Sequence, residues 1–145
     1  ARLTAYVRSL DDKVTRLDRI EPDLNQATPG DPRDTTSPAA MLSTMHQLLM
    51  GNALSADSRK QLTTWLLANK TGDKRLRALL PAGWRAGDKT GSGAYGSTND
   101  IGILFPPDRA PLLVASYLTA TKASEAMRNA ALAEVGRLAA SVAAK

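Results

Sequence analysis

Two segments of this chain carry residue types whose spacing suits chemistry. Glu21 and Asn25 offer a carboxylate and an amide in a stretch interrupted by proline and glycine. A carboxylate that points into a cleft can act as a general base on a water molecule, and an amide nearby can hold that water. The segment from Lys89 to Ser92 (Lys-Thr-Gly-Ser) offers an ammonium group, two hydroxyls and backbone N–H groups. Such groups suit a ligand carboxylate and an oxyanion that develops during a reaction.

Other charged residues near these segments can be interpreted in two ways, as parts of the site or as ordinary surface residues. Arg19 and Asp34 have opposite charges and could clamp the two ends of the first segment, or they could form a surface pair worth at most about 1 kcal/mol. Arg75 lies among other basic residues, which fits a solvated helix face. It could equally bind the same ligand carboxylate as Thr90, because a guanidinium group suits bidentate binding. His46 is expected to be structural.

Composition argues against several functional classes. The chain has 145 residues, a net charge of +5, no cysteine and one histidine, so neither a metal site nor a cofactor is expected. Its basic residues are scattered, and it has only one Phe, two Trp and three Tyr, which disfavours a nucleic-acid partner. No apolar run approaches the roughly 18 residues of a membrane-spanning helix.

Periodicity and turn residues predict a helical part followed by a sheet. No period holds over about 14–36, which is therefore expected to be a long, functional loop. Ser37 and Ser55 are expected to cap two helices. The predicted helices cover 3–10, 38–50, 56–69, 76–80 and 124–142, and the predicted antiparallel strands cover 85–93, 100–105 and 112–118. Leu62, Trp65 and Leu66 are predicted to form the apolar stripe of the third of these helices. The last helix is predicted to cover one face of the sheet, with its apolar face formed by Met127, Ala131, Val135, Leu138 and Val142.

The two parts are not expected to be independent domains. Residues 1–80 form part of a helical region that includes the long loop, and residues 81–145 form part of an α/β region. Three strands and one helix make a thin core, so each part is expected to need further material. The chain is therefore expected to be incomplete.

Four motifs occur in an order and spacing that resemble class A serine β-lactamases. They are the Glu21-to-Asn25 loop, the run Asp31-Pro-Arg-Asp-Thr-Thr-Ser-Pro38, Leu80-Pro-Ala-Gly-Trp84 and Asp88-Lys-Thr-Gly91. The resemblance extends over essentially the whole chain. It implies an α/β (α+β) fold of the β-lactamase/transpeptidase type and hydrolysis of penicillins and cephalosporins through a serine acyl-enzyme.

The resemblance also implies roles for individual residues. Glu21 is expected to activate the deacylating water with the help of Asn25, and the Glu21-Pro22 bond is expected to be cis. Lys89 is expected to shape the field around the substrate carboxylate. The residues expected to bind that carboxylate are Lys89, Thr90, Gly91, Ser92 and Arg75. Ser92 is also expected to supply one of two oxyanion N–H donors.

The chain departs from the family at three places. No Ser-x-x-Lys motif occurs, so the nucleophile is expected in a missing N-terminal part of the same enzyme, and no Ser-Asp-Asn motif occurs either. Thr98 stands where many relatives carry an arginine, and Arg75 is placed as the substitute arginine of relatives with this change. This chain alone is therefore expected to be inactive.

Two alternatives to a β-lactamase remain at this stage. One is a catalytically silent fragment that only binds β-lactams or belongs to an assembly. The other is a penicillin-binding protein, which typically lacks the glutamate loop that is present here. The resemblance further implies a bacterial protein that is periplasmic or secreted.

Overall fold

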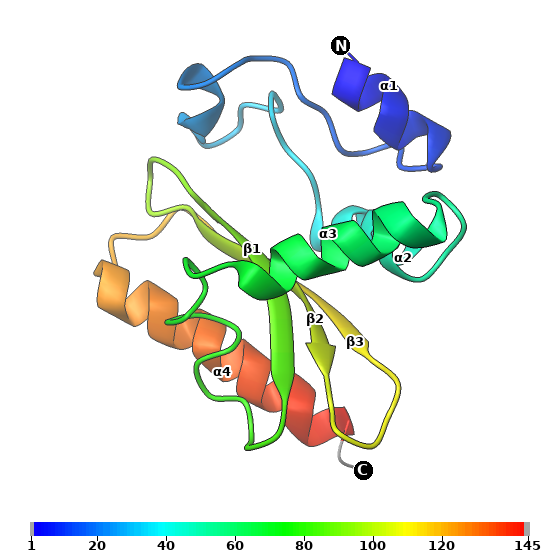
Figure 1. The fold of residues 1–145 in the computed structure, drawn as a ribbon. Helices are drawn as coiled ribbons and strands as arrows, with labels where there is room; N and C mark the ends of the chain where they lie inside the picture. Colours follow the sequence, from blue (N-terminus) through cyan, green and yellow to red (C-terminus); the bar gives the residue numbers. More distant parts are fainter. Residues whose placement is uncertain (1, 144–145) are drawn as a thin grey trace.

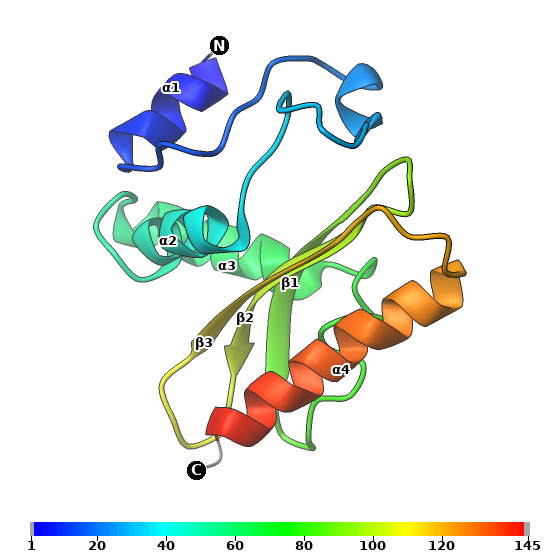
Figure 2. The same cartoon turned by 180° about the vertical axis from the view of Figure 1, so that it is seen from behind.

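The computed structural model describes residues 2–143 and places a three-stranded antiparallel sheet between two layers of helices. Helices α2 (Pro38–Leu49) and α3 (Ala56–Ala68) lie on one face of the sheet, and α4 (Glu125–Ala143) lies on the other (Figures 1 and 2). Helix α1 (Arg2–Ser9) and the long loop that follows it lie at the end of the molecule opposite the C-terminal end of α4 (Figure 1). This arrangement confirms the predicted fold class.

The predicted strands are confirmed as a sheet with the order β1-β2-β3. They are β1 (Arg85–Ser92), β2 (Thr98–Phe105) and β3 (Leu112–Leu118). Strand β1 is an edge strand, so one edge of its backbone is not paired within the described sheet. The register sets Thr90 opposite Asp100 on β2. The motif that suits an anionic ligand therefore lies on the open edge of the sheet.

The core between the sheet and the α2/α3 layer is apolar. Met45, Leu49 and Ile103 are buried in it, and Leu62 and Leu66 of α3 pack against them. Trp65, predicted to share this apolar stripe, is instead 66% exposed. The prediction was wrong because α3 meets the core along the narrow line of Leu62 and Leu66, four residues apart, and Trp65 points away from that line.

Helices α2 and α3 begin where the sequence predicts. The Ser37 hydroxyl accepts the Ala40 N–H at 3.2 Å, and the Ser55 hydroxyl accepts the Ser58 N–H at 3.2 Å. Each bond satisfies one of the N–H groups that the first turn of a helix leaves without a partner. Pro38 occupies the first turn of α2, where its missing N–H is harmless.

The predicted apolar face of α4 is wrong. The residues predicted to form it are exposed: Met127, Ala131, Val135, Leu138 and Val142. The buried positions are Asn129, Leu132, Ala133, Gly136 and Ala140. Small residues are needed on this side because the helix approaches the segment before the sheet closely: a Cβ added at Gly136 would lie 2.0 Å from the Leu76 carbonyl oxygen.

The short helix predicted at 76–80 is also wrong, because residues 71–79 form consecutive turns. The Leu76 N–H donates to Asp100 Oδ2 at 3.1 Å, instead of to a carbonyl of its own segment. The Arg75 N–H bonds a carbonyl only three residues earlier, at 2.9 Å. Contacts with the sheet therefore outweigh the helix propensity of this leucine-rich segment.

Candidate active site

The long loop is closed at its base by paired contacts between its two ends. The Thr15 and Thr36 hydroxyls are 2.6 Å apart, and the Arg16 N–H donates to the Thr35 carbonyl at 3.0 Å. These contacts join residues about 20 positions apart in the chain. Inside them the loop makes a single turn of 3-10 helix, η1 (Asp23–Asn25).

Arg19 and Asp34 form an ion pair within this closed base. Arg19 Nε lies 2.5 Å from Asp34 Oδ2, and the two side chains are only 14% and 3% exposed. Asp34 Oδ1 also accepts the N–H groups of Asp18 and Arg19, at 2.7 and 2.9 Å. Burial alone would raise the pKa of Asp34, but the hydrogen bonds from Arg19 and Asp18 outweigh it and hold the pKa below its usual value. The carboxylate therefore stays ionised, and the pair is far less solvated than a surface ion pair.

Glu21 and Asn25 lie in the turn of the loop that these closing contacts support. The Glu21-Pro22 peptide bond is cis, as the resemblance implies. Asn25 Nδ2 donates a hydrogen bond to Glu21 Oε2. Glu21 is exposed and Asn25 is half-buried, so solvent reaches the carboxylate.

The loop touches the end of β1 directly. The Ala94 N–H donates to the Asn25 carbonyl at 3.1 Å. Gly93 permits this approach, because a Cβ at this position would lie 2.8 Å from the same carbonyl oxygen. Two segments nearly 70 residues apart in the sequence are thereby brought side by side.

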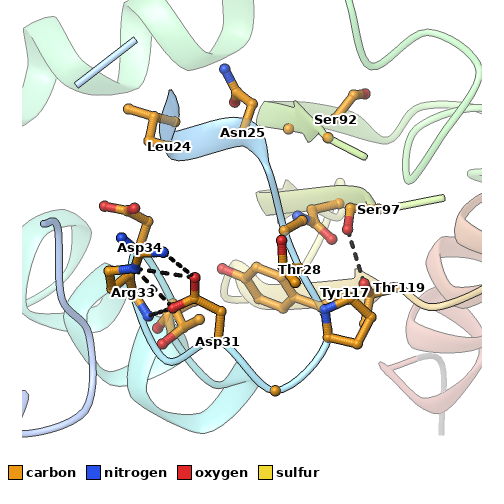
Figure 3. A pocket seen from close by; sticks show the side chains of 18 of the residues that line it. Leu24, Asn25, Thr28, Asp31, Arg33, Asp34, Ser92, Ser97, Tyr117 and Thr119 are labelled. Carbon is orange, nitrogen blue, oxygen red and sulfur yellow. Dashed lines mark hydrogen bonds and ion pairs between the residues drawn. The ribbon is translucent and has the colours of Figure 1, made fainter. Parts of the chain in front are cut away.

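A cavity of about 430 Å³ lies between the loop and the sheet. Figure 3 shows the Tyr117 side chain within it, with Asn25 and Ser92 on the same side of its rim. Burial raises the pKa of Tyr117 to about 12, so this phenol stays neutral. Glu21, Lys89 and Thr90 do not line the cavity, which means that only part of the predicted set borders it.

The motif on β1 presents its polar groups at the surface. Lys89 is exposed, and its ammonium group donates to the Thr90 carbonyl at 2.7 Å. The Thr90 hydroxyl lies 2.5 Å from the hydroxyl of Thr71, in the turns before β1. Ser92 is exposed at the end of the strand. Residues of the 71–79 segment thus hold both hydroxyls of the motif: Thr71 holds that of Thr90, and Arg75 holds that of Ser92.

Arg75 is buried beneath this motif, at 7% exposure, and does not lie on a solvated helix face. Its guanidinium donates to the Gly91 and Asn99 carbonyls, at 2.9 and 2.7 Å. It also donates to the Ser92 hydroxyl at 2.9 Å and to Asn129 Oδ1 at 3.0 Å. The arginine therefore links β1, β2 and α4, and it orients the hydroxyl of Ser92.

Sequence reasoning missed a buried polar layer behind the motif. Asp88 and Asp100 are both completely buried, and Asn129 on α4 is 7% exposed. The position of Asp100 carried a signal, because this acid directly precedes the apolar part of β2 and shares a strand face with Leu104. In the part of the chain that the structure describes, no group of acidic or histidine side chains could hold a metal ion, and no helix could cross a membrane.

Comparison with known proteins points to one family. The family model described as "Beta-lactamase enzyme family" matches residues 1–143. β-Lactamase AER-1 of Aeromonas hydrophila is 50% identical over 132 residues, which are 91% of this chain and 43% of that protein. β-Lactamase CTX-M-6 of Salmonella typhimurium is 49% identical over 137 residues, 94% of this chain and 47% of that protein.

Solved structures agree with these relatives. An ancestral class A β-lactamase is 61% identical and superposes with a TM-score of 0.95, over 97% of this chain and 54% of that one. The chain spans less than half the length of the curated relatives it matches, at 43% and 47%. From the family match, the sequence identity and the shared fold, we conclude that the chain belongs to the β-lactamase enzyme family, among the class A members.

Proposed function

We propose that this chain is the part of a class A β-lactamase that supplies the deacylation base and half of the substrate cradle. In the complete enzyme a serine outside these 145 residues attacks the β-lactam carbonyl and forms an acyl-enzyme. Its substrates are penicillins and cephalosporins, and no cofactor takes part. The partner of this chain is the part of the enzyme that bears Ser-x-x-Lys. The enzyme is expected in the periplasm or outside the cell.

The contact between the loop and β1 is the observation that carries this proposal. The Ala94 N–H holds the Asn25 carbonyl at 3.1 Å, and Asn25 also donates to Glu21. A base and a ligand-binding strand that are anchored to each other can act on the same bound molecule. The ion pair of Arg19 with Asp34 keeps the loop in this position.

The proposed chemistry follows from the groups present. Glu21 takes a proton from a water molecule as that water attacks the acyl carbonyl, and Asn25 holds the water or the carboxylate in place. The Ser92 N–H stabilises the oxyanion that develops, together with a donor outside this chain. Lys89, Thr90 and the Ser92 hydroxyl bind the substrate carboxylate. Arg75 assists by orienting Ser92.

A catalytically silent fragment is the second candidate, and the lack of a Ser-x-x-Lys motif in the sequence favours it. The two candidates differ in one test. The 145-residue chain is mixed with the N-terminal part of a class A relative that carries Ser-x-x-Lys and Ser-Asp-Asn, and cephalosporin hydrolysis is measured. A split enzyme regains hydrolysis, whereas a silent fragment does not.

The role of Glu21 is tested in the same mixture. Glu21→Gln keeps the size of the side chain but removes the base, so deacylation is expected to slow by about 10²- to 10⁴-fold. Intact mass spectrometry should then show an accumulating acyl-enzyme on the added polypeptide. Glu134→Gln, which changes an acid paired with Arg137 on α4, is the matched control and should leave turnover unchanged. Unchanged turnover in Glu21→Gln would refute the assignment of the base.

A further inference from the structure

Two aspartates lie side by side beneath the β1 motif, and both are completely buried. Asp88 lies opposite Gly102, and Asp100 lies opposite Thr90, so the acids are diagonal neighbours on one face of β1 and β2. Gly102 carries no side chain that could separate them: a Cβ there would lie 3.4 Å from the Cβ of Asp88. Two carboxylates confined in this way cannot both be ionised without a large electrostatic cost.

Asp88 has partners for both of its oxygens. Arg77 Nε donates to Oδ2 at 2.9 Å, and the Arg77 terminal nitrogen Nη2 donates to Oδ1 at 2.8 Å. Asn69 Nδ2 donates to Oδ1 as well. This bidentate geometry is that of a guanidinium with an ionised carboxylate, so Asp88 is the member of the pair that holds the negative charge.

Asp100 has a partner for only one oxygen. Its Oδ2 accepts the Leu76 N–H at 3.1 Å, whereas its Oδ1 is buried and accepts no hydrogen bond from the described residues. A buried carboxylate oxygen without a donor is costly. A neutral carboxyl group instead carries an O–H donor, and Asp88 provides an acceptor.

Burial and the charge of Asp88 together favour the neutral form of Asp100 below about pH 7. Burial and the negative charge of Asp88 raise the pKa of Asp100 to about 7, against the weaker opposing effects of the Leu76 N–H, Arg75 and Arg77. Arg128 on α4 donates to the Thr98 hydroxyl and to the Ala123 carbonyl, so its guanidinium is engaged elsewhere.

We propose that Asp100 is a positioning residue that keeps a proton near neutral pH and donates it from Oδ1 to the Asp88 carboxylate. The shared proton joins β1 to β2 at this point, and Asp100 Oδ2 anchors the backbone of Leu76. Arg75 precedes that anchor and holds the Ser92 hydroxyl at 2.9 Å. The acid pair therefore sets the position of Ser92. Its effect on substrate binding rests on the proposed function, but the shared proton does not.

Carboxyl NMR of the 145-residue chain tests the proton directly. Aspartate carboxyl carbons are labelled with ¹³C, the Asp100 signal is identified by its loss in Asp100→Asn, and the sample is titrated from acid to mildly alkaline pH. We expect Asp100 to titrate with a midpoint near 7, against its ordinary 3.8. A midpoint below about 4.5 would overturn the proposal, because Asp100 would then be ionised like an ordinary aspartate.

The positioning role has its own readout in the guanidinium N–H signals of Arg75. These signals are expected to shift with the same midpoint as Asp100 and to lose that transition in Asp100→Asn, which keeps the acceptor for Leu76. Asp73→Asn is the matched control, because Asp73 is an exposed acid 3.5 Å from Arg77, and it should leave the transition intact. The positioning role would be refuted if the Arg75 signals did not shift as Asp100 titrates. Both NMR results stand whether or not the reconstituted chain hydrolyses β-lactams, so failure of the proposed function is recognised separately.

Should Asp100→Asn fail to fold, the Asp100 signal in the unaltered chain is assigned from its through-bond correlations. The same midpoint then decides the question. In a reconstituted enzyme, the KM for a cephalosporin should depend on pH near 7 in the parent chain and lose this dependence in Asp100→Asn, with kcat little changed.

Discussion

Gly136→Ala on α4 should destabilise the chain, although alanine is the better helix former. In a helix interior the change from glycine to alanine normally stabilises by about 1 kcal/mol. Here the added Cβ would lie 2.0 Å from the Leu76 carbonyl oxygen and 2.9 Å from its carbonyl carbon. Nonbonded heavy atoms ordinarily lie about 3.5 Å apart or more, so the helix or the 71–79 segment must move by roughly 1.5 Å.

The size of the effect follows from the two groups that would be disturbed. Forcing an extra methyl group into a packed interior costs about 1–3 kcal/mol. Displacing Leu76 also weakens its hydrogen bond to Asp100, which is worth about 1 kcal/mol. After the gain in helix propensity is subtracted, the free energy of unfolding should fall by about 2 kcal/mol, equivalent to a Tm lower by about 4–8 °C.

Thermal and urea unfolding followed by circular dichroism would measure this change. Ala131→Gly, on the exposed side of the same helix, is the control: it should cost about 1 kcal/mol through helix propensity alone. If Gly136→Ala proved as stable as the parent chain or more so, α4 would not approach Leu76 as described. The reasoning about the small residues on its buried face would then fail.

Two further changes test the buried charges. Burial raises the pKa of Asp12, but the hydrogen bonds from Thr15, the neighbouring N–H groups and Thr44 outweigh it and lower the pKa below 3.8. The unfolded chain therefore takes up this proton first as the pH falls, so the contribution of Asp12 to stability is complete above the unfolded-state pKa and is lost as the pH falls through the lowered folded-state pKa. Asp12→Asn should flatten that dependence in urea unfolding at several pH values, and an unchanged acid slope would contradict the assignment. Arg77→Ala should lower the free energy of unfolding by about 3 kcal/mol, because it leaves Asp88 buried without its cation. A loss below about 1 kcal/mol at neutral pH would mean that solvent reaches Asp88.

Local signals in the sequence were sufficient for most of the fold. Ser37 and Ser55 predicted two helix starts because a capping hydroxyl acts within one turn, and the structure has both bonds. The apolar runs at 100–105 and 112–118 predicted two strands of the sheet, because such a run is also a local feature of the sequence. Such features depend on residues that are close together in the chain, so they can be predicted from the sequence.

Features that depend on partners distant in the chain were not predictable in this way. The helix expected at 76–80 is replaced by turns because Leu76 bonds to a strand 24 residues later. Helix α4 buries the side that carries Ala133, Gly136 and Ala140, since Gly136 meets a backbone and not a side chain. In the site, the residue types of the motifs were readable, but the burial of Arg75 beneath Ser92 depends on contacts that no spacing reveals.

Because contacts close the long loop at its base, the length of the loop can change without loss of its function. Contacts between Thr15 and Thr36 and between Arg19 and Asp34 hold the two ends together whatever lies between them. Insertions at the exposed Pro29-Gly30 turn would cost only slowly growing loop entropy, about 0.6 kcal/mol for each doubling of loop length. A deletion between Thr15 and Arg19 would instead displace the Arg19–Asp34 pair relative to the Thr15–Thr36 contact. As this lineage diverges, insertions and deletions should therefore accumulate near the Pro29-Gly30 turn. They should be selected against near the contacts that close the loop.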